Sequence, residues 1–166
     1  MLGVNWTEYF HPTWAIQLEH PLQWGVSSQA ADGSEFLLLA APQDDNGCQP
    51  HIVIRRIVQT SDAILNLDCY IDDLVPSLMG SEVGFSFLER GEFTHRNGNR
   101  CVYLEYGSEP EGVCLKTRTC FVTLNSSSTF VFSCSASSPA WNRYTDLFNH
   151  IVLSSSDKSD LNLLSF

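Results

Sequence analysis

The chain has 166 residues, of which 43% are hydrophobic and 17% are charged, and its formal net charge is −10. This length and balance are typical of one folded domain with a sizeable core, and they exclude an intrinsically disordered chain. The acidic charge argues against a nucleic-acid ligand, because phosphate binding requires a surplus of Lys and Arg on one face. It suits a basic protein partner, and it suits plain solubility equally well.

Two short extended pieces are predicted first, at residues 15–19 and 24–27. An Asp32-Gly33 turn signal then leads into strands at residues 35–40 and 51–58. Both of these strands are apolar on both faces, as Phe36-Leu37-Leu38-Leu39 illustrates. A strand with one wet face would alternate between apolar and polar residues. Helices are therefore expected to cover both sides of the sheet.

Two helices are predicted. The first spans residues 66–79, with Asn66 as its N-cap and Pro76 inside it. The second begins at Ser138-Pro139, a cap followed by proline at the first helical position. Each carries an apolar stripe at helical spacing: Leu67, Tyr70, Ile71, Leu74 and Leu78 in the first, and Trp141, Tyr144, Phe148, Ile151 and Val152 in the second.

Further strands are expected at residues 83–93, 101–106, 113–124 and 129–137, with hairpin connections at 107–112 and 125–128. This order predicts an α+β fold: an antiparallel β-sheet sandwiched between helices in three α/β/α layers. We expect a single domain over residues 1–166, with a core at about 14–155 and a C-terminal tail at 156–166.

Six cysteines are present: Cys48, Cys69, Cys101, Cys114, Cys120 and Cys134. None of them forms a C-x-x-C pair, so a zinc or thioredoxin-type motif has no support. Most lie in apolar runs, where free cysteine behaves as a small hydrophobe. We expect six reduced, mostly buried thiols in a reducing compartment, with no metal and no cofactor.

No stretch approaches the about 18 consecutive apolar residues of a membrane span. The first residues also lack the basic and apolar regions of a signal peptide. The expected location is therefore the cytoplasm. Export is the alternative if the chain is a mature fragment.

Several local motifs resemble the PsbP-like superfamily, which also holds the Ran-binding Mog proteins and the DcrB-related proteins. The motifs are the extended stretch from Trp14 through Pro21 to Trp24, the strand Pro50-His51-Ile52-Val53-Ile54, the strand Gly98-Asn99-Arg100-Cys101-Val102-Tyr103-Leu104-Glu105-Tyr106, and the approach to a Trp-bearing helix, Ser135-Ala136-Ser137-Ser138-Pro139-Ala140-Trp141. The resemblance covers residues 14–155. One departure is the Ser-Phe that family members carry directly after the closing helix, since this chain reaches Ser165-Phe166 only after a tail.

The resemblance implies a binding function. PsbP-like proteins associate with photosystem II, the Mog branch binds the GTPase Ran, and DcrB-related members include cytosolic chaperones for secreted toxins. Because one fold serves such different partners, the fold alone does not select among them.

Catalytic motifs are absent from the sequence: there is no P-loop, G-x-G-x-x-G, H-E-x-x-H or G-x-S-x-G. The five histidines are scattered, and His20 and His150 are predicted to be surface or capping residues. A Cys–His pair could still assemble in space, because such partners need not be close in sequence.

Two groups of residues are candidates for partner binding. Trp6, Tyr9 and Phe10 precede the first predicted strand, and any part of this cluster left outside the core would anchor a partner. Asp68 and Asp72 share a face of the first helix and could bind a basic partner, although a solvated acidic face is the more ordinary reading. Arg55 and Arg56 point to opposite faces of one strand, where at least one could pair with a carboxylate.

Three functions follow from these observations. The leading hypothesis is a non-catalytic cytosolic adaptor or chaperone-like protein of the DcrB-related kind that binds another protein. The second is a PsbP-type accessory subunit of a membrane complex. The third is an enzyme with a spatially assembled Cys or His site.

Overall fold

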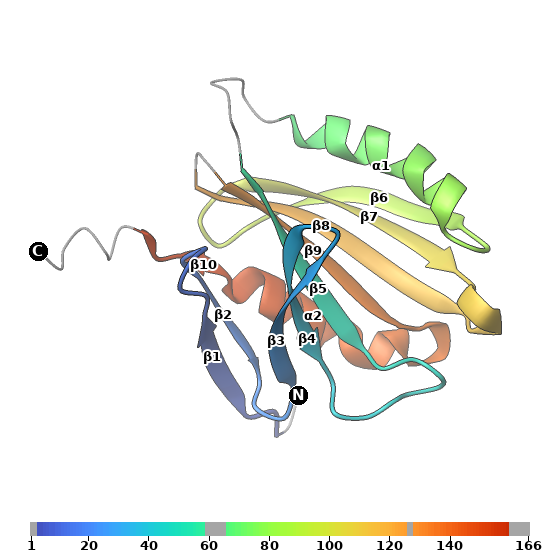
Figure 1. Cartoon of the computed structure of the whole chain (residues 1–166), viewed down its shortest axis with the longest axis horizontal. Coiled ribbons are helices and arrows are strands. Elements are labelled where there is room, and N and C mark those ends of the chain that lie inside the picture. Colours follow the sequence, from blue (N-terminus) through green and yellow to red (C-terminus); the bar gives the residue numbers. More distant parts are fainter. Residues whose placement is uncertain (1–2, 59–65, 126–127, 160–166) are drawn as a thin grey trace, which may run out of the picture.

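A computed structural model describes residues 3–58, 66–125 and 128–159 (Figure 1). This part of the chain is an α+β fold with two antiparallel sheets and two helices. The larger sheet has seven strands in the order β3-β4-β5-β9-β8-β7-β6, and the smaller sheet has the order β1-β2-β10. The strands of the larger sheet are β3 (Gly25–Ala31), β4 (Ser34–Ala40), β5 (His51–Val58), β6 (Ser86–Thr94), β7 (Arg100–Ser108), β8 (Leu115–Asn125) and β9 (Ser128–Ser137).

The predicted strands of the larger sheet and the Asp32-Gly33 turn are present. At the β3–β4 hairpin, Asp32 and Gly33 both have positive φ, at 51° and 76°. These angles match the two-residue turn whose twist suits a tight antiparallel hairpin. Every described pair of neighbouring strands in this sheet is antiparallel, as expected.

Successive residues of β7 and β8 enter two different hydrophobic clusters, because side chains alternate between the faces of a strand. In β8, Cys120 and Val122 join the cluster that contains α2 (Trp141–Ser154), whereas Phe121 joins the cluster that contains α1 (Leu67–Ser81). Figure 1 shows α1 running along β6 and β7, away from α2.

The expectation that β4 and β5 are covered on both faces is only half right. Leu37 and Leu39 of β4 and Ile54 of β5 are fully buried in the α2 cluster. On the other face, Leu38 and Val53 are only partly buried, because α1 packs against β7 instead of these strands. The apolar run in the sequence therefore does not mean that a helix covers this face of β4 and β5.

The smaller sheet was not expected. It consists of β1 (Trp6–Phe10), β2 (Ile16–Pro21) and β10 (Ser156–Asp157). Strand β1 precedes residue 14 in the sequence and β10 follows residue 155, so both lie outside the range predicted for the core. It packs on the α2 side of the molecule, where Ile16 and Leu18 are buried in the α2 cluster. The backbone amide of Glu19 donates a hydrogen bond of 2.9 Å to the Ser154 hydroxyl, and this bond connects β2 to the end of α2.

Both helices begin close to their predicted starts. The Asn66 side chain accepts a hydrogen bond from the Asp68 backbone amide at 3.1 Å, as an N-cap should. A short 3₁₀ turn, η2 (Ser138–Ala140), leads through Pro139 into α2. The predicted cap Ser138 lies inside this turn, and the residues at the two N-cap positions, Ser137 and Ala140, provide no side-chain cap. Trp141 is 4% exposed and therefore belongs to the core, as its stripe predicted.

No helix in the described ranges is long and apolar enough to cross a membrane. The Ser165-Phe166 motif and part of the predicted 125–128 connection lie outside the described residues.

Candidate functional site

The predicted aromatic group, Trp6, Tyr9 and Phe10, lies entirely in strand β1. Trp6 and Tyr9 are partly buried against the core, and Trp6 stacks on the His150 ring with the ring centroids 3.8 Å apart. Phe10 is 44% exposed. Most of the predicted group therefore packs inside the protein, and Phe10 is its exposed part.

The predicted acidic pair on α1 is engaged by arginines of the neighbouring strands. Arg90 on β6 contacts Asp72 at 2.5 Å, and Arg100 on β7 contacts Asp68 at 3.3 Å. A hydrogen bond from Arg100 is the main reason that the pKa of Asp68 lies below its usual value. These ion pairs hold the first turns of α1 to the sheet, so a basic partner would have to compete with two arginines.

Neither Arg55 nor Arg56 forms an ion pair in the described ranges. Arg55 lies over the Phe36 ring at 5.0 Å from its centroid, and Arg56 donates to the Ser128 hydroxyl at 3.1 Å. Arg55 is near a helix layer, since it borders a groove beside α1.

All six cysteines are free thiols, which agrees with the sequence prediction. Only Cys101, Cys120 and Cys134 are buried, and Cys69 and Cys114 are exposed, so the expectation of mostly buried thiols was too broad. Burial raises the pKa of Cys120 to about 12. This thiol stays protonated near neutral pH, whereas a nucleophilic cysteine needs a depressed pKa.

The histidines are more buried than their scattered positions suggested. His20 is only 7% exposed, which corrects its predicted surface position: its Nδ1 faces the Pro21 carbonyl at 2.9 Å within strand β2. His150 is partly exposed and lies 2.6 Å from a Glu19 carboxylate oxygen. Neither arrangement gathers metal ligands, and no group of three or more metal-binding side chains exists within the described part of the chain.

One histidine lies beside a serine hydroxyl. His95 Nε2 is 3.2 Å from the Ser155 Oγ, and His95 Nδ1 accepts a hydrogen bond from the Asn97 backbone amide. A neutral ring that accepts at Nδ1 carries its proton on Nε2, so it donates to Ser155. A general base would need the opposite tautomer, with Nε2 free to take the serine proton. The Ser155 hydroxyl itself donates to the Val152 carbonyl.

Exposed apolar side chains are concentrated where α1 ends and β6 begins. Met79 and Val83 are each 66% exposed, Phe87 is 54% exposed and Leu88 is 49% exposed. These are four of the seven large hydrophobic side chains that are exposed among the described residues. We call these four residues and the groove beside them the α1 edge surface.

Local backbone geometry creates this exposure. The Glu82 amide caps α1 by donating to the Leu78 carbonyl at 2.8 Å, and Gly84 turns the chain with a φ of +67°. Strand β6 is an edge strand of the larger sheet, and its register shifts between Phe87 and Glu89. This bulge leaves Leu88 without a register partner on β7.

The groove has a volume of about 410 Å³ and runs between α1 and the sheet. Its apolar floor includes Phe121 and Val131, and Tyr70, Leu74 and Leu78 of α1 form one side. Tyr106, a buried residue, lines the groove and pairs in register with Phe87.

Carboxylates surround the α1 edge surface. Asp73 lines the groove, Glu82 follows α1, and Glu109 and Glu111 lie on the adjoining loop, whose Glu109 amide donates to the Val83 carbonyl at 2.7 Å. None of these four carboxylates takes part in an ion pair within residues 3–58, 66–125 and 128–159. The surface therefore combines apolar contact area with four carboxylates outside any described ion pair, against a single groove-lining cation, Arg55.

Sequence reasoning did not select these residues. The signal was present in the run Val83-Gly84-Phe85-Ser86-Phe87-Leu88, where apolar side chains precede the charged Glu89-Arg90. The sequence could not show that β6 is the edge strand of the larger sheet. At that edge, no further strand of the described chain lies beside these apolar side chains.

Neither a protein-family model nor a curated protein sequence matches the chain. Solved structures do match. Cyanobacterial PsbP (CyanoP) from Synechocystis is 13% identical with a TM-score of 0.68, covering 94% of this chain and 95% of that one. The Ran-binding protein Mog1p of Saccharomyces cerevisiae is 9% identical with a TM-score of 0.56, covering 95% and 98%. LpqN of Mycobacterium tuberculosis, which is involved in cell envelope biogenesis, is 14% identical with a TM-score of 0.58, covering 92% and 90%.

The chain thus adopts the Mog1/PsbP-like fold, and the resemblance found in its sequence is confirmed at the level of the fold. Identities this low carry no information about partners, because one fold supports unrelated functions.

Proposed function

We propose that the chain is a non-catalytic protein-binding domain, an adaptor or chaperone-like protein of the DcrB-related kind that acts in the cytoplasm. The observation that carries this proposal is the α1 edge surface, where four exposed apolar side chains adjoin an apolar groove. Apolar side chains gathered in this way are typical of protein-interaction sites. The fold supports the proposal, since Mog1p is a Ran-binding protein of the same fold.

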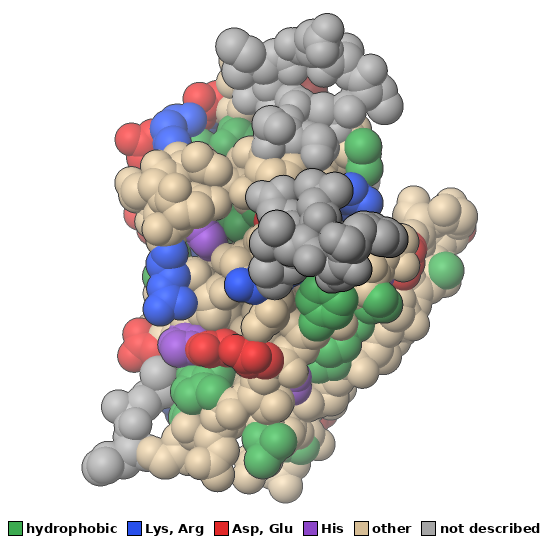
Figure 2. Space-filling view, turned by 90° about the vertical axis from the view of Figure 1, so that its left-hand side faces the viewer, with side chains coloured by type: hydrophobic (Ala, Val, Ile, Leu, Met, Phe, Trp, Pro, Cys, Tyr) green, Lys and Arg blue, Asp and Glu red, His purple; other side chains and the backbone are tan. Residues whose placement is uncertain are grey.

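The partner has an apolar segment flanked by Lys or Arg. The apolar part would pack on Met79, Val83 and Phe87, and the cations would face the carboxylates Glu82 and Glu109. The net charge of −10 would speed the encounter through the long-range field. Nucleic acid does not fit this chemistry. In the view of Figure 2, Lys and Arg side chains are interspersed with Asp and Glu and form no basic face.

A PsbP-type accessory subunit of a membrane complex is the second candidate, supported by the similarity to CyanoP. In either role the two helices and the larger sheet would form the scaffold, and we propose that they make a three-layer α/β/α arrangement. The third candidate, an enzyme, needs an activated nucleophile or base. The tautomer of His95 and the raised pKa of Cys120 both point away from one.

Site-specific photocrosslinking tests the proposal. Benzoylphenylalanine is placed at Phe87 in the full chain, and separately at Leu22 as a matched control, because Leu22 is 61% exposed at the end of β2. We expect one protein from the native host to crosslink at position 87 and not at position 22. Equal capture at both positions would contradict the assignment of the surface.

The captured partner is then purified for binding kinetics. We expect Phe87→Ser to weaken binding at least about tenfold and Leu22→Ser to leave it unchanged, because a central apolar contact contributes more than 1 kcal/mol. We also expect the association rate to fall as salt is raised, because screening shortens the reach of the charge field. An association rate that does not respond to salt would refute the basic partner.

A further inference from the structure

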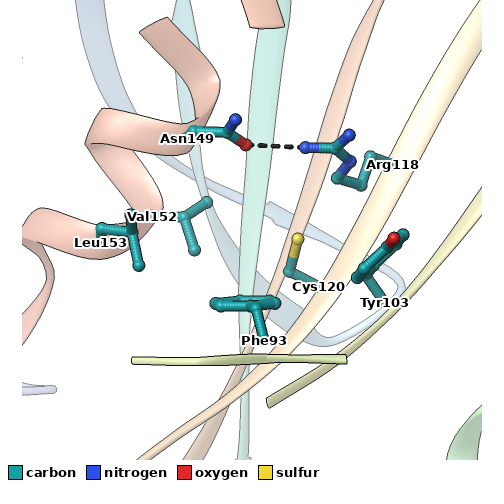
Figure 3. A pocket seen from close by; sticks show the side chains of 7 residues that line it. All are labelled: Phe93, Tyr103, Arg118, Cys120, Asn149, Val152 and Leu153. Atoms are coloured by element: carbon teal, nitrogen blue, oxygen red, sulfur yellow. Dashed lines mark hydrogen bonds between the residues drawn. The ribbon is translucent and has the colours of Figure 1, made fainter. Parts of the chain in front are cut away.

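A second pocket lies on the opposite face of strands β7 and β8 from the α1 edge surface. Its volume is about 240 Å³, and it opens between α2 and the outer strands of the larger sheet (Figure 3). Seven residues line it: Phe93, Tyr103, Arg118, Cys120, Asn149, Val152 and Leu153. Figure 3 shows Val152, Phe93 and Cys120 forming an apolar wall, with Arg118 and Asn149 facing each other across the top.

A glycine makes room for one side of this pocket. Gly91 on β6 pairs in register with Tyr103 on β7, and a Cβ on Gly91 would lie 2.6 Å from the Tyr103 ring. Without that Cβ, the Tyr103 ring lies against the backbone of β6, and its hydroxyl donates to Glu89 at 2.9 Å. The ring is thereby held as a fixed wall.

The polar end of the pocket is a guanidinium group that the protein holds in place. Glu105, which is 3% exposed, accepts from Arg118 Nε at 2.7 Å and also contacts Arg118 Nη2. The guanidinium carbon lies 5.2 Å from the centroid of the Tyr103 ring. Burial lowers the pKa of Arg118, but the hydrogen bond and the charge of Glu105 outweigh this effect and raise the pKa above its usual value.

The Glu105 carboxylate forms ion pairs with two cations, Arg118 and Lys116. Lys116 Nζ is 3.2 Å from its second oxygen, so Glu105 offsets only one of the two positive charges beside it. In an acidic protein, this cluster keeps one formal positive charge next to an apolar cavity. A positive charge in such a place favours an anionic ligand group.

Asn149 is the second hydrogen-bond partner of Arg118 and also lines the pocket. Its side-chain oxygen accepts from Arg118 Nη1 at 2.7 Å, and this residue of α2 is exposed. Hydrogen bonds to Glu105 and Asn149 use two of the five N–H groups of the guanidinium within the described part of the chain, and Nη2 also contacts the same Glu105 oxygen. A carboxylate entering the pocket could bind the remaining donors or displace the neutral Asn149 oxygen.

We propose that this pocket binds a small carboxylic acid with an aromatic or branched apolar body, whose carboxylate pairs with Arg118 and whose body packs between Phe93, Tyr103 and Val152. The volume fits this class. An engineered cavity of about 150 Å³ holds benzene, and the additional volume of this pocket has room for a short chain that ends in a carboxylate. The buried thiol of Cys120 is protonated and adds only apolar surface. This site is independent of the proposed protein partner.

The test uses the ¹⁵N-labelled full chain and two probes of equal size, 3-phenylpropionate and its neutral amide, 3-phenylpropanamide. The readouts are the side-chain amide signals of Asn149 and the Nε–H signal of Arg118. We expect both signals to shift with the acid, with a Kd at or below about 1 mM. The acid should bind about tenfold more tightly than the amide, because only the acid forms a charge-assisted pair with the guanidinium.

Two substitutions at one exposed position sharpen the test without touching the core. Asn149→Asp places a carboxylate on Arg118 and should weaken binding of the acid about tenfold while leaving binding of the amide unchanged. Asn149→Ala frees the Nη1 donor and should bind the acid at least as tightly as the original chain. Equal affinity for acid and amide, equal effects of the two variants, or shifts confined to residues outside the pocket would each overturn the proposal.

Discussion

Replacing Trp141 by Ala tests whether α2 is anchored in the core as the structure describes. The side chain is 4% exposed, and its ring centroid lies 5.6 Å from that of Phe148. A buried Trp removes about 200 Å² from water, which is about 5 kcal/mol at 25 cal/mol per Å². Alanine keeps roughly 1 kcal/mol of this, so the expected loss in the free energy of unfolding is about 4 kcal/mol.

Trp141 also packs against a partly buried cation, since Lys116 Nζ lies 4.9 Å from its ring centroid. Trp24→Ala is the matched control, because Trp24 is 7% exposed and also packs on Phe148 but has no cation over its ring among the described contacts. We expect Trp141→Ala to cost about 1 kcal/mol more than Trp24→Ala, from the lost cation–π contact. Urea melts of both variants give the comparison. A loss below about 1 kcal/mol for Trp141→Ala would refute the packing of α2 described above.

Three further predictions concern thiols, pH and the wall of the Arg118 pocket. Thiol titration without reductant should find the exposed Cys69 and Cys114 reactive in the native protein and six thiols after unfolding; fewer than six would contradict the absence of disulfides. Burial lowers the pKa of His95, so the unfolded chain binds this proton more readily. Stability should therefore fall as the pH drops below about 6.5, and melts of His95→Gln at pH 7.5 and 5.5 should show a smaller difference than the original chain. Gly91→Ala should cost about 1–3 kcal/mol through the clash with Tyr103. The same change in a Tyr103→Ala background should cost less, and a cycle showing no coupling would rule out that contact.

The sequence predicted the elements whose signals are local. The periodic stripes placed both helices, and Asp32-Gly33 placed a hairpin turn, because capping and turn conformations depend on a few neighbouring residues. Strand β10 could not be found this way. Its two residues are too few to show a strand pattern. It forms because the end of α2 lies beside β2, where Ser156 and Asp157 can pair with the edge of that strand.

The sites were harder to predict than the elements. The sequence selected Asp68 and Asp72 as a helix face that is solvated or binds a basic partner, but Arg90 and Arg100 reach them from strands that lie beside α1 only in the folded chain. No sequence motif marks Glu105 and Arg118 as a pair, and their pairing depends on the register between β7 and β8. Register is a long-range property that neither composition nor spacing specifies.

The position of β2 also constrains the order in which the protein can be made. This strand is paired with β1 on one side and with β10 on the other, and Glu19 bonds to Ser154, 135 residues later in the chain. During synthesis, the first hairpin leaves the ribosome long before α2 and β10 exist. The large sheet can close around β8 and β9 while the small sheet still lacks its last strand. Residues up to Asp157 must therefore be synthesised before β2 gains its last partner strand. Native-state hydrogen exchange should accordingly report β1 and β2 as a unit that opens separately from the larger sheet.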